Sequence, residues 1–258
     1  MTTTVLCDLD GVLYRGAAPI PGASTALGKL IGAVESVFFI TNNSTRTPEA
    51  TAEKIIRLTG VEVGGDQVLT SAQAAATMLD DSDGPILVVG EDGLRDSLRS
   101  AGFEITEAPD SAGAVVVGLT RSLSYDDITH AMQAIRGGAR FVATNDDTSF
   151  PTEDGLAPGS GAIVAAIAAA AGATPEVAGK PNPAMRDLIR SKVNGDVWVI
   201  GDRLDTDIAL AASEPGWRSI LVLTGITGRD EASDTPADEV VDDFPAAVDL
   251  VLEQLQQS

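Results

Sequence analysis

The chain has 258 residues, 44% of them hydrophobic and 21% charged, a composition that excludes a disordered or fibrous protein and allows one large domain or two modest ones. Asp and Glu outnumber Lys and Arg by 38 to 17, and the resulting net charge of −21 argues against nucleic-acid and anionic-membrane partners. A single cysteine, and the lack of a long apolar run or a leader-like N-terminus, favour a cytoplasmic protein.

Short apolar runs rich in β-branched residues alternate with helix-like stretches along the chain. We expect strands at residues 5–7, 37–41, 67–70, 86–89, 114–119, 140–144, 197–200 and 220–223. We expect helices at residues 22–31, 47–58, 71–79, 94–101, 125–135, 160–171, 183–190, 206–212 and 245–256. The runs lack the polar alternation of a half-solvated strand, so the pattern predicts an α/β fold with parallel sheets and crossover helices.

Two polar, turn-rich stretches, residues 80–85 and 172–175, each follow an expected helix and precede a strand, which for the second stretch is the short run at residues 176–178. They are candidate domain boundaries, although composition alone does not distinguish them from ordinary loops. The acidic stretch from Asp230 to Asp243 is interpreted as solvated surface.

The first expected strand ends in two carboxylates, Asp8 and Asp10, followed by Gly11. Residues two apart in a strand point to the same side, so both carboxylates are expected at the carboxyl edge of a parallel sheet, where α/β folds build their sites. A divalent cation or a bound proton would relieve the repulsion between two such anions. The alternative is a solvated turn, because Asp and Gly are common turn formers.

Carboxylates also follow the expected strand at residues 197–200, where Asp202, Asp205 and Asp207 come close together. Oxygen-rich clusters of this kind suit Mg²⁺, which takes a few carboxylates and completes its shell with water and substrate oxygens.

Thr41 and Asn42 end the second expected strand, just before a helix whose N-terminus favours an anion. Taken alone, they would be interpreted as turn and helix-capping residues. Lys180 stands between Gly179 and Pro181 and is one of four lysines in the chain. Alone, it would be read as a solvated charge.

Together these clusters supply a nucleophile, a metal site, polar groups for a phosphate and a cation. That inventory matches phosphoryl transfer, in which an enzyme positions an anion and neutralises developing charge.

Four motifs of the chain, in this order, resemble those of the haloacid dehalogenase-like phosphatases: Asp8-Leu9-Asp10-Gly11, Thr41-Asn42-Asn43-Ser44, Gly179-Lys180-Pro181 and Gly201-Asp202-Arg203-Leu204-Asp205-Thr206-Asp207. The long interval between the second and third motifs resembles the branch with a large α/β cap, subfamily IIA. That branch includes p-nitrophenyl, phosphoglycolate, glycerol-phosphate, pyridoxal-phosphate and nucleotide phosphatases.

The resemblance implies a role for each motif residue. Asp8 would attack the substrate phosphorus and form an aspartyl-phosphate, and Asp10 would protonate the leaving oxygen and then activate water. Mg²⁺ would be held by Asp8, the Asp10 backbone carbonyl and Asp202, with Asp207 in a supporting position. Phosphoryl oxygens would be bound by Thr41 and Asn42, and Lys180 would balance their charge.

The resemblance also implies a Rossmann-like parallel-sheet core formed by residues 1–81 and 175–258, with an inserted α/β cap at residues 82–174. Cap residues would set specificity for a small phosphorylated metabolite, and Asn145, Asp146 and Asp147 are the first candidates. The alternative for these three residues is a turn cluster without substrate contact. Large caps in this branch often mediate dimers, so a homodimer is an expectation that rests on the resemblance alone.

Two other functions remain open at this point. A phosphotransferase or mutase would use the same core. A non-catalytic protein that senses a phosphorylated ligand would keep the fold, but it would not need the nucleophile Asp8.

Overall fold

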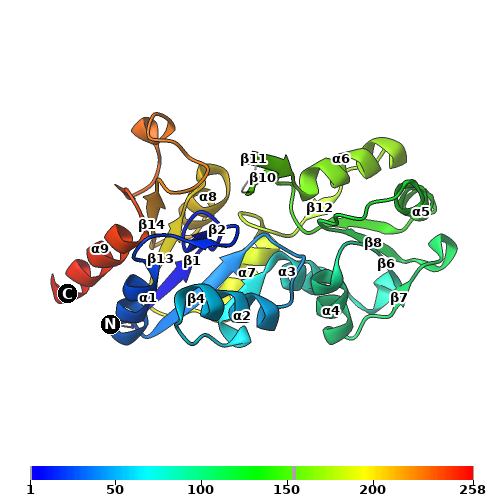
Figure 1. The fold of residues 1–258 in the computed structure, drawn as a ribbon. Coiled ribbons are helices and arrows are strands. Elements are labelled where there is room, and N and C mark those ends of the chain that lie inside the picture. The colour runs from blue at the N-terminus through cyan, green and yellow to red at the C-terminus, as the bar shows by residue number, and fades with distance from the viewer. Residues whose placement is uncertain (1, 153–154, 258) are drawn as a thin grey trace.

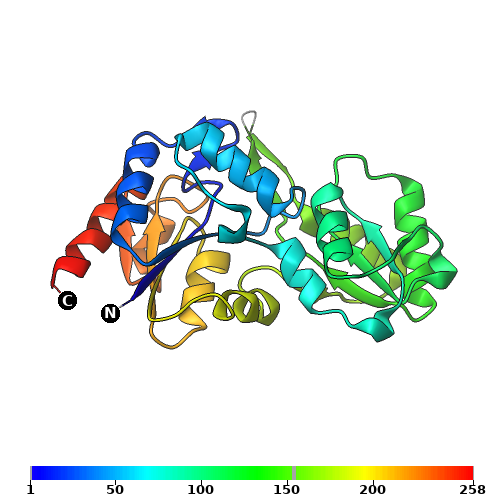
Figure 2. The same ribbon diagram turned by 90° about the horizontal axis from the view of Figure 1, so that it is seen from below.

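The structure is a computed structural model that describes residues 2–152 and 155–257. Two parallel sheets form two lobes that lie side by side (Figures 1 and 2). The strand order of the larger, six-stranded sheet is β15 (Glu239–Val241), β14 (Trp217–Val222), β13 (Asp196–Gly201), β1 (Thr3–Cys7), β4 (Ser36–Thr41) and β5 (Val68–Thr70). We call this lobe the core.

The core sheet is buried on both faces, as its apolar sequence predicts. All five residues of β1 are buried, and alternate side chains enter different hydrophobic clusters. Val5 and Cys7 pack with α1 (Ala23–Ala33), α2 (Pro48–Thr59) and α9 (Phe244–Gln257). Leu6 lies in the cluster formed with α3 (Ser71–Thr77), α7 (Pro183–Arg190) and α8 (Ala209–Ala212).

The second lobe, which we call the cap, contains a five-stranded parallel sheet. Its strand order is β12 (Glu176–Val177), β9 (Arg140–Ala143), β8 (Ala114–Val117), β6 (Ile86–Val89) and β7 (Ile105–Thr106). One face is covered by α5 (Tyr125–Arg136) and α6 (Ser160–Ala171), and the other packs with α4 (Asp92–Ser100). The predicted fold class, a Rossmann-like α/β core with an inserted α/β cap, is confirmed.

Two segments connect core and cap: the chain leaves the core after α3 and returns to it after β12. Because β12 pairs with β9, the cap sheet extends past residue 174, where the sequence placed the second boundary. Division into a core of residues 1–81 and 175–258 and a cap of residues 82–174 stays a prediction.

Several short elements were not expected from the sequence. They are the hairpin of β2 (Tyr14–Arg15) and β3 (Ala18–Pro19), the hairpin of β10 (Ser149–Thr152) and β11 (Gly155–Pro158), and the strands β7 and β15. Strand β15 lies within the acidic stretch interpreted as solvated surface, where it forms the edge of the core sheet beside β14. The helix expected at residues 206–212 begins as a wide helical turn at Leu204–Ile208 and continues as α8. Short 3-10 turns cover Gly65–Gln67, Asp81–Asp83, Pro109–Ser111 and Glu231–Asp234.

Among the residues that the structure describes, no helix combines the length and the apolar character needed to cross a membrane.

Candidate active site

Polar side chains from three neighbouring strands meet at the carboxyl edge of the core sheet. Asp8 follows β1, Thr41 ends β4 and Asp202 follows β13, and β1 lies between the other two strands. All three residues are buried. The strand order therefore brings together residues that are far apart in the sequence, at the edge where parallel α/β sheets carry their sites.

The loop after β1 passes so close to Asp202 that one position needs glycine. Gly11 has a φ angle of +90°, and a Cβ atom there would lie 2.6 Å from Asp202 Oδ2. The backbone N–H of Ile226 donates a hydrogen bond of 2.7 Å to the same oxygen. Asp202 is thus held by contacts that any side chain at position 11 would disturb.

Lys180 lies at the centre of the site and is only 2% exposed. Its Nζ donates hydrogen bonds of 2.6 Å to Asp8 Oδ1 and 2.6 Å to Asp207 Oδ1. Burial alone would lower the pKa of Lys180, but the charges of Asp207 and Asp8 outweigh it and hold the pKa above its usual value. The ammonium group therefore stays charged and couples the first motif to the fourth.

The carboxylates of the cluster share one buried cation, so their charge is only partly balanced. Burial raises the pKa of Asp8 well above its usual range, and Asp207 and Asp202 raise it further, against the opposing charge of Lys180. The pKa of Asp202 is raised to about 7, mainly by burial and secondly by the negative charge of Asp207. An additional positive charge at this place would favour the ionised forms.

Asp10 is half-buried and has a different neighbourhood. Lys54 Nζ lies 4.0 Å from Asp10 Oδ1 and 3.7 Å from the centre of the Tyr14 ring. Burial raises the pKa of Asp10, while the charge of Lys54 lowers it. A carboxyl group that retains its proton more readily than usual suits an acid in proton transfer.

Thr41 and Asn42 line the same cavity as Lys180. Both ends of the Asn42 side chain are engaged: Oδ1 accepts a hydrogen bond from Lys180 N at 2.8 Å, and Nδ2 lies 3.3 Å from Asp147 Oδ2. Asn42 thus joins the Lys180 loop to the cap.

The three cap candidates occupy different positions. Asn145 is buried and donates from Nδ2 to the carbonyl oxygen of Asn42 at 2.7 Å. Asp147 lines the cavity and lies 3.7 Å from the Arg203 guanidinium of the core. Asp146 is exposed and does not line this cavity. Two of the three residues therefore bridge cap and core.

A cavity of about 110 Å³ lies between core and cap over the carboxylate cluster. Its core side is lined by the residues of the four motifs: Asp8, Asp10, Thr41, Asn42, Lys180, Asp202 and Asp207. Residues that the sequence did not single out line the cap side: Leu119, Arg121, Ser149, Phe150 and Ser160. Of these, Leu119 ends the expected strand at residues 114–119 and Ser160 begins the expected helix at residues 160–171, but neither was a candidate for the site.

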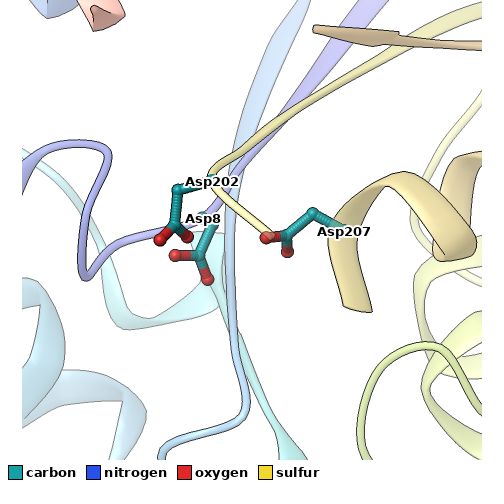
Figure 3. A group of neighbouring side chains, drawn as sticks. All are labelled: Asp8, Asp202 and Asp207. Atoms are coloured by element: carbon teal, nitrogen blue, oxygen red, sulfur yellow. The ribbon is translucent and has the colours of Figure 1, made fainter. Parts of the chain in front are cut away.

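The donor set of the cluster fits a hard divalent cation. Asp8, Asp202 and Asp207 each offer a carboxylate oxygen, and these oxygens lie within 4.8 Å of one another. In Figure 3 the carboxylates of Asp8 and Asp202 lie together, and Asp207 projects toward them from the next helical segment. Oxygen donors of this kind are what Mg²⁺ takes in proteins. Both carboxylate oxygens of Asp207 accept hydrogen bonds, Oδ1 from Lys180 Nζ and Oδ2 from Arg203 N, which leaves Asp8 and Asp202 as the better placed pair.

Comparison with known proteins agrees with this arrangement. Residues 5–104 match the family of haloacid dehalogenase-like hydrolases, and residues 177–247 match a second HAD-hydrolase-like family. An acid sugar phosphatase of Staphylococcus haemolyticus is 36% identical over 231 residues, which cover 88% of this chain and 87% of that protein. A 5'-nucleotidase of Bacillus subtilis is 34% identical over 234 residues, which cover 89% of this chain and 90% of that protein.

A solved structure shows the same fold with a metal. The glycerol phosphate phosphatase of Mycobacterium tuberculosis in complex with magnesium superposes with a TM-score of 0.84 at 36% identity, covering 93% of this chain and 75% of that one. The fold and site define a capped α/β hydrolase. The chain belongs to the haloacid dehalogenase-like hydrolases, in the large-capped branch formed by these phosphatases. The predicted family and enzyme class are therefore confirmed.

Proposed function

We propose that the protein is a Mg²⁺-dependent phosphatase that hydrolyses a small phosphomonoester through an aspartyl-phosphate on Asp8. One observation carries the proposal: the Asp8 carboxylate, ion-paired with a buried lysine, forms the floor of a cavity covered by the cap. Such a site excludes water from a reactive intermediate while positioning a phosphoryl group over a nucleophile.

In the proposed reaction, a carboxylate oxygen of Asp8 attacks phosphorus and the bond to the leaving oxygen breaks. The Asp10 carboxyl gives its proton to that leaving oxygen. Asp10, now ionised, then takes a proton from a water molecule that attacks the phosphorus. This second step releases inorganic phosphate and restores Asp8. The raised pKa of Asp10 supports its role as the acid of the first step.

Lys180, Thr41 and Asn42 are the proposed phosphate-binding side chains, and Asn42 also holds Lys180 in place through the hydrogen bond that it accepts from the Lys180 backbone. The Lys180 ammonium remains charged and lies 2.6 Å from the nucleophile, so it is placed to balance charge on the transferring phosphoryl group.

Mg²⁺ would be held by the side chains of Asp8 and Asp202 and by the Asp10 backbone carbonyl, with Asp207 fixing Lys180. When bound, the cation offsets negative charge at the phosphoryl group and the carboxylates. The raised pKa values of Asp8 and Asp202 support a place for such a charge.

The substrate class is a small phosphorylated metabolite. The relatives are named for sugar phosphates, nucleotides and glycerol phosphate, so the leaving group varies within the branch. We propose that Asn145 and Asp147 help to close the cap over the substrate, through their contacts with Asn42 and Arg203. Asp146 stays a candidate from the sequence alone, because it is not among the described residues that line this cavity.

The proposal is tested by phosphate release from a panel of phosphomonoesters, with Mg²⁺ and with a chelator. We expect metal-dependent release that falls at least about 10³-fold in Asp8→Asn, because that variant lacks the nucleophile. Asp196→Asn is the matched control, because Asp196 begins β13 at the opposite edge of the same sheet.

Unchanged release by Asp8→Asn would refute the mechanism. Transfer of the phosphoryl group to an added acceptor without phosphate release would identify a phosphotransferase or mutase instead. Thermal stabilisation by phosphate esters without turnover would identify a ligand-sensing protein.

A further inference from the structure

The cap side of the cavity differs chemically from the phosphate side. The start of α6 and the β10–β11 hairpin lie on the side of the cap that faces the core strands (Figure 1). They place Phe150 and Ser160 in the cavity wall, beside Leu119 and Arg121 from the segment after β8. If Asp8 and Lys180 hold the phosphoryl group, the leaving group lies against this wall.

Ser160 is the first residue of the twelve-residue helix α6 and is 2% exposed. Its Oγ makes no hydrogen bond with any of the residues that the structure describes. A buried hydroxyl without a partner is costly and therefore uncommon in a folded protein. The neighbouring polar side chains Asn42, Asn145 and Asp147 all have partners within the chain. The hydroxyl of Ser160 is thus left available for a ligand in the cavity.

The charges of the cap wall are paired. Arg121 Nη1 donates to Glu91 Oε1 at 3.0 Å, and its guanidinium lies 5.9 Å from the centre of the Phe150 ring. Asp147 is balanced by Arg203. Among the described residues of this wall no cation is left unpaired, so the wall offers little attraction to a second anionic group on the substrate. The Arg121 guanidinium lies over one face of the Phe150 ring, which leaves only the other face for stacking with a base.

The size of the cavity favours a short leaving group. At about 110 Å³ it is smaller than cavities that enclose a benzene molecule, which measure about 150 Å³.

We propose that Ser160 binds a hydroxyl group of the leaving group, and that the preferred substrates are phosphomonoesters of short, neutral polyols. This inference rests on the proposed phosphatase function. The hydroxyl of Ser160 and that of the substrate satisfy one another in the closed site, and a substrate without hydroxyl groups leaves Ser160 unpaired.

The test compares glycerol 3-phosphate with n-propyl phosphate, which has the same carbon chain without hydroxyl groups. For Ser160→Ala we expect kcat/KM on glycerol 3-phosphate to fall roughly three- to tenfold, as for one hydrogen bond, and kcat/KM on n-propyl phosphate to stay within about twofold. Ser97→Ala is the matched control, because Ser97 is also a buried cap serine, but its Oγ donates to Gly93 O and it does not line the cavity.

Equal effects of Ser160→Ala on both substrates, or no effect on either, would overturn the inference. A wild-type preference for 3-phosphoglycerate, whose leaving group carries a carboxylate, would also overturn it.

A binding measurement separates this inference from the proposed function. In an Asp8→Asn background, calorimetry with the same two esters reports binding without turnover. If the wild type releases phosphate from no ester, the proposed function fails. The subsite would still be supported if Asp8→Asn/Ser160→Ala binds glycerol 3-phosphate more weakly than Asp8→Asn does, while the two variants bind n-propyl phosphate equally well. Binding that does not depend on Ser160 would overturn the subsite, whether or not the enzyme turns over.

Discussion

The active-site side chains are held by a small set of buried ionic contacts. Lys180 is paired with two carboxylates, and Asp202 adds a third that the lysine does not contact. Three buried carboxylates against one ammonium group leave excess negative charge in the active site. Burying this unbalanced charge costs free energy. This excess makes the cluster both a cation site and a source of pH-dependent stability.

The first prediction concerns pH and the free energy of unfolding in chelator. The pKa of Asp202 rises from 3.8 to about 7 on folding, chiefly through burial. Between these values the folded state binds more protons than the unfolded state, so stability present at low pH is lost as pH rises toward 7. Asp8 acts in the same direction.

Urea unfolding at pH 5 and pH 7.5 measures this effect. We expect Asp202→Asn to lose less stability than the wild type as the pH rises from 5 to 7.5. Added Mg²⁺ should restore the stability of the wild type at pH 7.5, because it binds the folded state. Identical pH slopes for the wild type and Asp202→Asn would contradict the account.

At the scale of elements, strand ends and the loops after them build the site. The apolar runs before Asp8, Thr41 and Asp202 predicted these strand ends correctly, because a buried parallel strand is a local pattern. The β10–β11 hairpin escaped prediction, because its sequence contains two prolines and a glycine and resembles a loop. Its contribution to the cavity wall was therefore missed as well.

The second prediction tests the close approach of the β1 loop to Asp202. Gly11→Ala puts a Cβ in a backbone conformation with φ of +90° and 2.6 Å from Asp202 Oδ2. We expect a loss of about 1–3 kcal/mol of stability and a fall in kcat/KM of about 10²-fold as Asp202 is displaced. Chemical denaturation and steady-state kinetics measure the two effects.

Gly28→Ala provides the control for this substitution. Gly28 lies inside α1, and a Cβ there meets nothing within 4 Å. We expect that variant to gain about 0.5–1 kcal/mol, because alanine favours a helix, and to keep its activity. If Gly11→Ala is as stable and as active as Gly28→Ala, the loop after β1 does not approach Asp202 closely enough to require glycine at position 11.

In the whole molecule, core and cap share one continuous cluster of buried hydrophobic side chains. It contains Leu6 and Ile40 of the core sheet together with Val88 and Val116 of the cap sheet. Arg140 in β9 adds polar links to both connecting segments. It donates to Met78 O and lies 3.3 Å from Asp83 Oδ2, while Nε donates to Glu176 Oε1 at 2.7 Å.

The third prediction follows from these links. In Arg140→Ala we expect faster amide hydrogen exchange at β12 and around residues 78–85, and a stability loss of about 1–2 kcal/mol. Arg99→Ala is the control, because Arg99 is exposed and pairs only with Asp96 of the same helix among its described contacts. Exchange that rises equally in both variants would show that Arg140 has no particular role between the lobes.

Long-range features of the molecule were harder to predict than local ones. The alternation of strands and helices indicated parallel sheets, and the family resemblance indicated an inserted cap. The sheet order and the contact between Asn42 and the Lys180 loop arise only from tertiary packing, because those residues are 138 positions apart. The unpartnered hydroxyl of Ser160 has no signature in a single sequence, because it is defined by what surrounds it.

Trapping the phosphorylated enzyme would test the proposed aspartyl-phosphate on Asp8 directly. Acid-quenched turnover mixtures containing Mg²⁺ and a hydrolysed ester would be digested and analysed by mass spectrometry. We expect a phosphoryl group on the peptide that contains Asp8. In Asp8→Asn we expect no phosphorylated peptide and no turnover. Turnover that persists in Asp8→Asn, or a phosphoryl group on a different residue, would contradict the proposed mechanism.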